Sequence, residues 1–468
     1  MLAFPGSALA FGPLSSFGTF GSGAGQLDSP QGVAVGPDGT VYVADIENHR
    51  VTGFEADGSF LQAMGSDVDP GGGDICTALS GCKAGVAGSS PRALTVPIGV
   101  AFGPEGRLFV SDANNNRVAV YASNGTFKYL FGTTHLHEPR GIQFDSSGLL
   151  YVANRSDNRV DVFTPGGAFV RGIGKEVNPD GGNVCTEETG CQAGPPADGS
   201  AGAMAGPQDV AFGPAGELIV ADGGNRRVDV FASDGTFLHA FGKEVDPVGG
   251  DDVCTIACQA GSGGAAPGAF ESPVDVAADV MGKVYVADRL NGRVSVSWMN
   301  GSFVDDFAVA AGPFGVTLDC RGGVWVSEAS ASFARVERFG EPGTLPPPCR
   351  PAPAPTLETI LESSSRPPSN RFRFVGLIKN RSNGSAVLFV RVPGPGKLFL
   401  WGRGVRRLRR TAPRMKTVRL PVKPKIPLKR FLKQHGRGRI RVNVSFEPSG
   451  GEVRTREKVI VLKRRKKG

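Results

Sequence analysis

Several features that define common protein classes are scarce or missing in this chain of 468 residues. No stretch of 18 consecutive apolar residues occurs, so the sequence predicts no membrane-spanning helix. Only five His are present, and no Gly-x-Ser-x-Gly segment occurs, which removes the signature of an α/β serine hydrolase. Glycine, at 68 residues, falls short of the one third that collagen requires.

Turn-forming and apolar residues are both plentiful. Gly and Pro together make up about 22% of the chain, against a usual value of about 12%. Apolar residues account for 40%, which is enough for a large core. The composition therefore predicts a globular chain of many short elements joined by tight turns.

Charge is divided unevenly along the chain. Residues 356–468 contain 31 Lys and Arg against 5 Asp and Glu, a net charge of +26, whereas residues 1–355 contain 21 against 39, a net charge of −18. This contrast predicts two domains with different partners, because a polyanion is attracted by one part and repelled by the other. The alternative is that the basic domain docks on the acidic one.

A repeat organises the acidic part. Six similar segments begin at Leu27, Leu94, Leu136, Met204, Phe270 and Ala310. Each holds up to four short β-branched or aromatic runs separated by turn dipeptides, the pattern of an antiparallel meander. One meander cannot bury both of its faces, whereas six arranged radially can. The sequence therefore predicts an all-β fold with a six-bladed β-propeller over residues 11–340.

The sixth repeat lacks its fourth run, because the chain becomes Pro-rich after Gly340. Residues 11–22 resemble the end of the first repeat. We therefore expect the N-terminal segment to supply the outer strand of the last blade. Closing the ring in this way protects two sheet edges that would otherwise favour aggregation.

Three segments of the first repeat resemble the NHL repeat. They are Pro-x-Gly-Val-Ala from Pro30, Val-Tyr-Val-Ala-Asp ending at Asp45, and Asn-x-Arg-Val from Asn48. The resemblance covers about residues 11–340 and implies a propeller, while leaving the function open. The family includes animal RNA-binding regulators, peptidyl amidating lyases and bacterial secreted proteins. Related propellers include gluconolactonase-like hydrolases that hold a metal in the central channel.

The resemblance favours a binding module over an enzyme. The lyases use His ligands, and the scattered His of this chain cannot place three side chains on one axis. The lactonase pattern needs Glu, Asn and Asp on inner strands, where Asp209 and Asp275 are the plausible matches. A lactonase- or lyase-type enzyme with a metal in the channel is the alternative.

Acidic and basic residues five positions apart recur in the repeats and are interpreted as structural. They are Asp45 with Arg50, Asp112 with Arg117, Asn154 with Arg159, Asp222 with Arg227 and Asp288 with Arg293. A carboxylate at a strand end can accept hydrogen bonds from turn amides while the guanidinium pairs with it. A ring of ligand contacts is the alternative.

Positions that differ between repeats are better candidates for function. The start of the strand expected to line the channel brings a mixed polar set to one mouth: Gln31, Arg140, Gln208, Asp209 and Asp275. Such a ring suits a small polar ligand or a peptide. The alternative is a water-filled funnel with no dedicated ligand.

Eight Cys fall into four pairs: Cys76 with Cys82, Cys185 with Cys191, Cys254 with Cys258, and Cys320 with Cys349. The first three pairs lie in similar Gly-rich inserts after repeats one, three and four. Close pairs in long loops predict disulfides and an oxidising compartment. A zinc site would require pairs from different blades to meet.

The same inserts carry candidate Ca²⁺ ligands: Asp67, Asp69, Asp74, Asp246 and Asp251. Oxygen ligands beside Gly can wrap Ca²⁺. No complete Asp-x-Asp-x-Asp-Gly loop with a closing Glu is present, so solvated turns are the favoured interpretation and no cofactor is predicted.

Residues 1–10 end in Ala8-Leu9-Ala10, which resembles a signal-peptidase site without the basic and apolar regions that precede one. We interpret them as the remnant of a signal peptide whose start codon lies upstream; an ordinary N-terminal tail is the alternative. With the disulfides, this favours a secreted or cell-surface protein of a bacterium.

A second β domain follows the repeats. Residues 341–356 form a Pro-rich linker, and alternating runs return over 357–462. About six strands are expected there, the clearest with Ile440, Val442 and Val444 facing inward, which predicts an immunoglobulin-like β-sandwich. A short helix is expected over 428–434, and residues 463–468 form a basic tail.

The basic domain supplies the candidate polyanion-binding residues: Arg406, Arg407, Arg409, Arg410, Arg439, Arg441, Lys463, Arg464 and Arg465. In an exported protein they favour an envelope polyanion such as teichoic acid, acidic polysaccharide or anionic lipid. Non-specific surface charge and nucleic acid are the alternatives, the latter without recognised RNA-binding motifs. The combined prediction is a monomeric, non-catalytic scaffold that binds a protein, peptide or glycan and is retained at the envelope.

Overall fold

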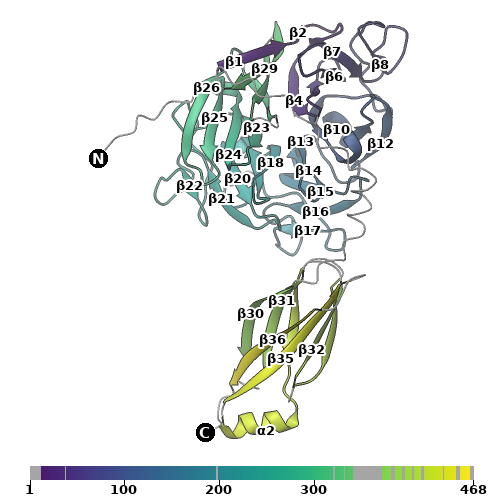
Figure 1. The fold of residues 1–468 in the computed structure, drawn as a ribbon. Helices are drawn as coiled ribbons and strands as arrows, with labels where there is room; N and C mark the ends of the chain where they lie inside the picture. The colour runs from purple at the N-terminus through teal and green to yellow at the C-terminus, as the bar shows by residue number, and fades with distance from the viewer. Residues whose placement is uncertain are drawn as a thin grey trace. The chain divides into compact units, whose positions relative to one another are not determined.

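The structure is a computed structural model that describes residues 12–36, 38–196, 199–319, 322–330, 332–340, 372–380, 385–392, 396–402, 405–412, 416–435, 437–448 and 454–463. Two compact units, Met1–Ala352 and Pro353–Gly468, divide the chain (Figure 1). No helix in the part of the chain that the structure describes is long and apolar enough to cross a membrane.

In the N-terminal unit, the described residues form six antiparallel sheets of four or five strands. Sheet 1 has β4 (Pro30–Val35), β5 (Val41–Asp45), β6 (Arg50–Phe54), β7 (Phe60–Met64) and β8 (Ile75–Cys76). Sheet 2 has β9 (Pro97–Phe102), β10 (Leu108–Asp112), β11 (Arg117–Tyr121) and β12 (Phe127–Phe131). Sheet 3 has β13 (Pro139–Phe144), β14 (Leu150–Asn154), β15 (Arg159–Phe163), β16 (Phe169–Ile173) and β17 (Val184–Cys185).

Sheets 4 to 6 continue the pattern. Sheet 4 has β18 (Pro207–Phe212), β19 (Leu218–Asp222), β20 (Arg227–Phe231), β21 (Phe237–Phe241) and β22 (Val253–Cys254). Sheet 5 has β23 (Pro273–Ala278), β24 (Lys283–Asp288), β25 (Arg293–Trp298) and β26 (Phe303–Ala308). Sheet 6 has β27 (Pro313–Leu318), β28 (Val324–Ser330), β29 (Phe333–Gly340) and β1 (Gly12–Phe17).

Short elements lie between the strands. The 3₁₀ turns are η1 (Pro104–Gly106), η2 (Ala113–Asn115), η3 (Arg155–Asp157), η4 (Gly223–Asn225) and η5 (Arg289–Asn291). β2 (Thr19–Phe20) and β3 (Gln26–Leu27) form a small parallel pair.

The six sheets are arranged in a ring. The first strands of consecutive sheets contact one another from β4 through β9, β13, β18 and β23 to β27, and β27 contacts β4 again. A separate hydrophobic cluster fills each junction between neighbouring sheets, including the junction between sheets 6 and 1. Burying both faces of each sheet against its neighbours is how a β-propeller is stabilised, and this unit has that fold.

The N-terminal strand completes sheet 6, as the sequence predicts. β1 pairs antiparallel with β29, from Gly12 opposite Gly340 to Phe17 opposite Val336. The Phe17 ring lies 4.5 Å from that of Phe54 in sheet 1 and 5.7 Å from that of Trp325 in sheet 6, measured between centroids. The first described residues of the chain therefore join the two ends of the ring.

Three inserts extend their sheets by a fifth strand that the sequence did not reveal. β8, β17 and β22 each pair with the preceding outer strand and lie on the outer rim in Figure 1. The disulfides Cys76–Cys82, Cys185–Cys191 and Cys254–Cys258 are formed, as expected. The first cysteine of each disulfide lies in one of these added strands, and the bond closes the loop that follows the strand. Cys320 and Cys349 lie outside the described residues.

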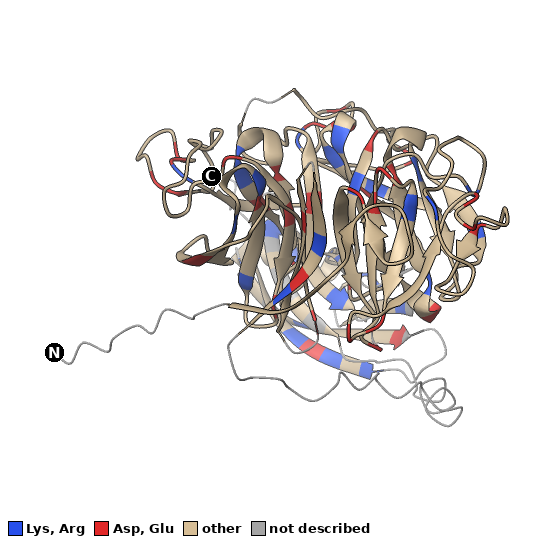
Figure 2. Ribbon diagram, turned by 90° about the horizontal axis from the view of Figure 1, so that it is seen from above, with Lys and Arg blue, Asp and Glu red and all other residues tan. Residues whose placement is uncertain are grey.

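The repeated Asp–Arg pairs are buried. Figure 2 marks the acidic and basic residues along the ribbon. Arg50 Nε donates to Asp45 Oδ2 over 2.8 Å, and both side chains are fully buried. The Arg50 guanidinium also donates to four backbone carbonyls, among them those of Ser22 and Lys83. These bonds tie each sheet to the loop that enters it, which supports the structural interpretation.

In sheet 3, the structure differs from the predicted pairing of Asn154 with Arg159. Asn154 stands where sheets 1, 2, 4 and 5 have Asp, and Arg159 pairs instead with Asp161 at 2.7 Å and Asp157 at 2.8 Å. Asn154 Nδ2 donates to Asp161 Oδ2 over 2.6 Å, so the neutral amide joins the same network. A carboxamide cannot neutralise a buried guanidinium, so carboxylates displaced along the chain supply the charge.

The described residues of the C-terminal unit form two antiparallel sheets. Sheet 7 has β30 (Arg373–Asn380), β31 (Ser385–Val392) and β34 (Lys416–Val422). Sheet 8 has, in order across the sheet, β33 (Leu408–Ala412), β32 (Gly396–Trp401), β35 (Arg437–Pro448) and β36 (Arg454–Lys463). α2 (Ile426–His435) includes the helix expected over 428–434.

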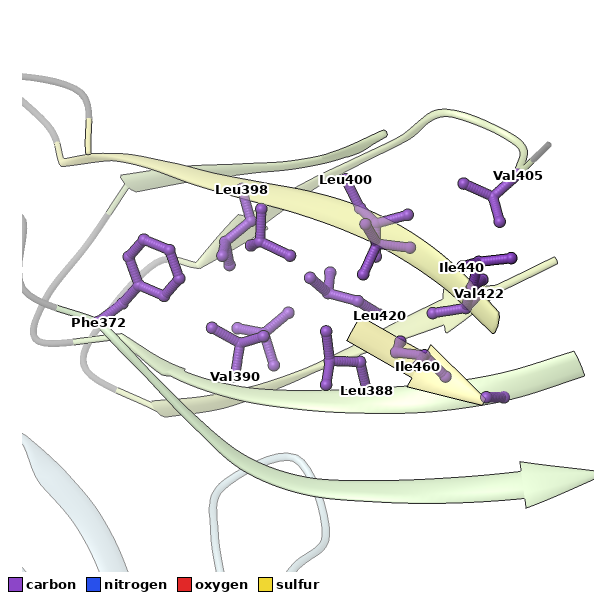
Figure 3. Close-up of a cluster of buried hydrophobic side chains, with 14 of the residues drawn as sticks. Phe372, Leu388, Val390, Leu398, Leu400, Val405, Leu420, Val422, Ile440 and Ile460 are labelled. Atoms are coloured by element: carbon purple, nitrogen blue, oxygen red, sulfur yellow. The ribbon is translucent and has the colours of Figure 1, made fainter. Parts of the chain in front are cut away.

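Inward side chains of both sheets form one core. Leu388 and Val390 of β31 meet Leu398 and Leu400 of β32 in the cluster of Figure 3. Ile440, Val442, Val444 and Phe446 are buried, as the alternation of β35 predicts. β33 was missed because its sequence, LRRTA, lacks an apolar alternation, and it forms an edge of sheet 8.

Candidate ligand site in the central channel

A cavity of about 660 Å³ lies between the first strands of the N-terminal sheets. The predicted channel residues Gln31, Arg140, Gln208, Asp209 and Asp275 all line it. They come from the starts of β4, β13, β18 and β23. The structure therefore brings these side chains to one cavity, although they do not share one role.

Glycine allows the inner strands to approach closely. A Cβ at Gly99 would lie 2.6 Å from the carbonyl oxygen of Arg140 in the next sheet, and Gly32 and Gly315 face the next inner strand in the same way. These positions form a constriction in which only backbone fits. A larger side chain there must displace a neighbouring sheet.

Aspartate takes the glycine position in sheets 4 and 5 and forms a bond across the junction. Asp209 Oδ2 accepts a hydrogen bond from the Val276 amide of sheet 5 over 3.0 Å. Asp275 accepts one from the Val316 amide of sheet 6. The other oxygen of Asp209 occupies the space beside Gly141, where a Cβ would overlap it. The two aspartates thus bridge neighbouring sheets.

Asp209, which the sequence analysis placed at the channel mouth, directs its carboxylate to the junction with sheet 5. Asp209 is 7% exposed, and burial raises its pKa to about 7 although the Val276 and Val210 amides lower it. Burial and the charge of Asp209 likewise raise the pKa of Asp275 well above its usual value. The two carboxyl groups also interact with each other, and burial favours the protonated form of both.

Arginines gather at another part of the same cavity. Arg140 Nη2 donates to Glu138 Oε1 over 2.7 Å, and Arg155 Nη1 donates to Glu138 Oε2 over 2.6 Å. Arg289 also lines the cavity, with its guanidinium carbon 4.2 Å from the centre of the Phe314 ring. Burial, with the charges of Arg155 and Arg289, lowers the pKa of Arg140 despite Glu138.

These contacts leave a local excess of positive charge. Glu138 is one carboxylate shared between two guanidinium groups, and Arg289 stacks on an aromatic ring and forms no ion pair with a described residue. Arg140 Nε and Arg155 Nε are buried without a hydrogen-bond partner among the described residues. Guanidinium groups with unused donors favour an anionic group, above all a carboxylate or a phosphate.

Sequence reasoning missed Arg155, Arg289 and Glu138. Arg155 and Arg289 occupy the position just after the repeated Asn154 and Asp288, where other repeats have Ile46, Ala113 or Gly223. Comparing the residue at this position between the repeats would have revealed both arginines. A residue that departs from the repeat pattern is less constrained by the structure of the repeat, so it is a better candidate for function.

The acidic loop residues serve their own loops. Asp67 pairs with Lys83 at 2.8 Å, and Asp74 pairs with Arg92 at 3.0 Å. Asp69 accepts from the Gly71 amide, and Asp246 accepts from the Val248 amide. Among the described residues, no three His, Cys, Asp or Glu side chains form a group that could hold a metal ion. Asp251 belongs to no such group either.

The polyanion candidates are partly described. Arg406, Arg407, Arg409, Arg410, Arg441 and Lys463 are exposed. Arg439 lies on β35 opposite Val461 of β36. Arg464 and Arg465 lie outside the described residues.

Comparison with known proteins identifies the repeat. The family described as NHL repeat matches residues 27–54 and 94–121, which lie in sheets 1 and 2 and the segments that enter them. Protein lin-41 of Caenorhabditis elegans is 48% identical over 52 residues, which is 11% of this chain and 4% of that protein. The chain therefore spans only a small part of the length of this curated relative.

Several solved structures resemble the chain. Virginiamycin B lyase from Staphylococcus aureus has a TM-score of 0.41 and 12% identity, over 66% of this chain and 94% of that one. A gluconolactonase from Xanthomonas campestris has a TM-score of 0.41 and 12% identity, over 70% and 98%. A chain of a nidogen/laminin complex has a TM-score of 0.38 and 17% identity, over 63% and 86%. Enzymes and a chain from a protein complex both occur, so the likeness does not distinguish catalysis from binding.

Proposed function

We propose that this chain is an exported six-bladed NHL-repeat propeller that acts as a non-catalytic binding scaffold, followed by an immunoglobulin-like sandwich that retains it on envelope polyanions. The ligand is a peptide, protein or glycan that presents an anionic group to the channel. The observation that carries the proposal is that Arg140 and Arg155 share the single carboxylate of Glu138, while Arg289 lines the same cavity.

The position of the cluster supports binding of a carboxylate. Arg140 and Arg155 are held in place by Glu138, so little side-chain entropy remains to be lost when a ligand arrives. A carboxylate can accept two parallel hydrogen bonds from one guanidinium, which gives both affinity and orientation. The three disulfides and the basic second unit support export and retention.

A peptide experiment tests the channel. The immobilised full chain is offered a pool of hexapeptides with free C-terminal carboxylates and the same pool amidated. We expect preferential retention of the free acids, reduced about tenfold by Arg140→Gln or Arg155→Gln, since a charge-assisted pair contributes roughly 1–3 kcal/mol. Arg107→Gln is the matched control, because Arg107 forms an ion pair with the exposed Glu105. Equal retention of both pools by all proteins would contradict an anion site.

A second candidate function rests on the paired carboxyl groups. Asp209, with a pKa raised to about 7 by burial, lines the cavity beside Asp275, and such a group suits proton transfer near neutral pH. Lactone hydrolysis, measured with and without EDTA on the wild type and on Asp209→Asn, tests this alternative. Turnover that disappears in Asp209→Asn would favour an enzyme over the scaffold.

A further inference from the structure

The outer face of sheet 8 carries two aromatic side chains on one strand. Along β32, Leu398 and Leu400 point into the core and are almost completely buried. Phe399 and Trp401 alternate with them and are half-buried. Because successive side chains of a strand point to opposite faces, both rings lie on the face away from the core.

Arginine flanks these rings on the edge strand. Phe399 stands opposite Arg409 of β33 on one side and Ser445 of β35 on the other. The Arg409 guanidinium carbon lies 5.3 Å from the centre of the Phe399 ring. A groove of about 570 Å³ is lined by Phe399, Trp401, Arg407, Arg409 and Ser445, among others.

The groove is positively charged. Arg407 and Arg409 are exposed and form no ion pair with any described acidic residue. The two described carboxylates on this face have cations beside them: Glu457 lies 3.5 Å from Arg441, and Glu447 stands opposite Lys397 in the strand register. The charge in the groove therefore comes from Arg407 and Arg409.

The geometry points to an acidic polysaccharide as the occupant, and we propose that this groove binds one. The face of a sugar ring can pack on the Trp401 indole, over which no described ring or cation lies, while a uronate carboxylate pairs with Arg407 or Arg409. The inference rests on the proposed retention at the envelope. A single-stranded nucleic acid could stack similarly, but the three disulfides favour an oxidising compartment outside the cytoplasm, away from the nucleic acid of the cell.

Sheet 7 supplies a matched control. Arg419 lies 5.6 Å from the centre of the Phe389 ring, and the two residues stand opposite each other on β34 and β31. This pair repeats the Arg409–Phe399 contact without an adjacent Trp. Changes at Phe389 and Arg419 therefore remove the same chemistry from a face for which no groove is proposed.

Affinity chromatography and titration of the full chain with alginate test the proposal. We expect Trp401→Ala to weaken alginate binding about tenfold without changing its dependence on salt. Arg407→Gln with Arg409→Gln should weaken it similarly and make it less sensitive to salt, because charge has been removed. Phe389→Ala and Arg419→Gln should each change affinity less than twofold. Trp401→Phe should retain most of the binding, which keeps the test decisive if Trp401→Ala fails to fold.

Further probes distinguish binding in this groove from the proposed general retention on envelope polyanions. Neutral dextran should not bind, and a 20-nucleotide oligo-dT and phosphatidylglycerol vesicles should bind more weakly than alginate. Tighter binding of oligo-dT that depends on Trp401 would overturn the proposal in favour of nucleic acid. The groove proposal would be wrong if Arg419→Gln weakened alginate binding as much as the groove variants, or if Trp401→Ala left alginate binding unchanged. Retention of the chain by its general positive charge would still stand. No binding of any polyanion would overturn both.

Discussion

Arginine has opposite roles in the two units of this chain. In the N-terminal unit, Arg50 and Arg227 are completely buried and paired with Asp45 and Asp229. In the C-terminal unit, Arg407 and Arg409 are exposed, and no carboxylate among the described residues pairs with them. A buried arginine that recurs with its partner indicates the fold, whereas an exposed one without a carboxylate indicates binding.

Arg140 lies between these extremes. It is half-buried and shares Glu138 with Arg155, so it is both held by the fold and incompletely neutralised. Binding sites need this combination, because a fully paired guanidinium has nothing left for a ligand and a mobile one loses entropy on binding. The comparison is therefore consistent with the proposal that the channel recognises a ligand and the basic unit provides attachment.

The largest expected effect removes a buried arginine. Arg50→Ala leaves the Asp45 carboxylate buried without its ion pair and should lower the free energy of unfolding by about 3–5 kcal/mol. Urea unfolding followed by circular dichroism measures it. Arg409→Ala is the comparison and should change stability by less than about 0.5 kcal/mol. Similar losses in both variants would contradict the distinction between the two kinds of arginine.

The next effect concerns ring closure, which only the N-terminal unit has. Phe17→Ala removes the ring that contacts Phe54 and Trp325, and should lower stability by about 2–4 kcal/mol. Differential scanning calorimetry should show that one transition moves while that of the C-terminal unit stays. Phe303, which is 38% exposed on β26, supplies the control Phe303→Ala. An unchanged thermogram would show that β1 does not lock the ring.

A smaller effect depends on pH. Burial raises the pKa of Asp209 from 3.8 to about 7, so the folded chain keeps a proton that the unfolded chain loses near pH 4. The free energy of unfolding should therefore fall as pH rises from 4 to 7, by at least about 1 kcal/mol. Asp209→Asn mimics the protonated form and should reduce this slope in urea titrations at pH 4.5, 6 and 7.5. If the slope is the same in Asp209→Asn as in the wild type, other titratable groups cause the pH dependence of stability.

The smallest effect is expected on the basic face. Replacing Arg406 or Arg410 by Gln should change the free energy of unfolding by less than about 0.5 kcal/mol, because each is exposed and without a carboxylate partner among the described residues. The same changes should weaken retention on an anionic matrix at low salt and make no difference at high salt. Elution at the salt concentration of the wild type would contradict a role in attachment.

Much of the fold follows from the sequence alone. The recurring runs predicted the meanders, the missing run after Gly340 predicted the pairing of β1 with β29, and the spacing of Cys76 and Cys82 predicted their disulfide. These features depend on contacts within one repeat or on a repeat that can be compared with its copies. Local periodicity therefore carries the necessary information.

Other features were decided only by tertiary structure. Asp209 was expected at a mouth but bonds to the next sheet, Arg159 takes Asp161 as partner, and Arg155 meets Glu138 and Arg140 in the channel. Trp401 becomes part of a groove only because the arginine-rich β33 pairs beside it. Each of these depends on which strands approach in space and how closely. A pattern along one chain specifies the strands, whereas burial and charge pairing arise between them.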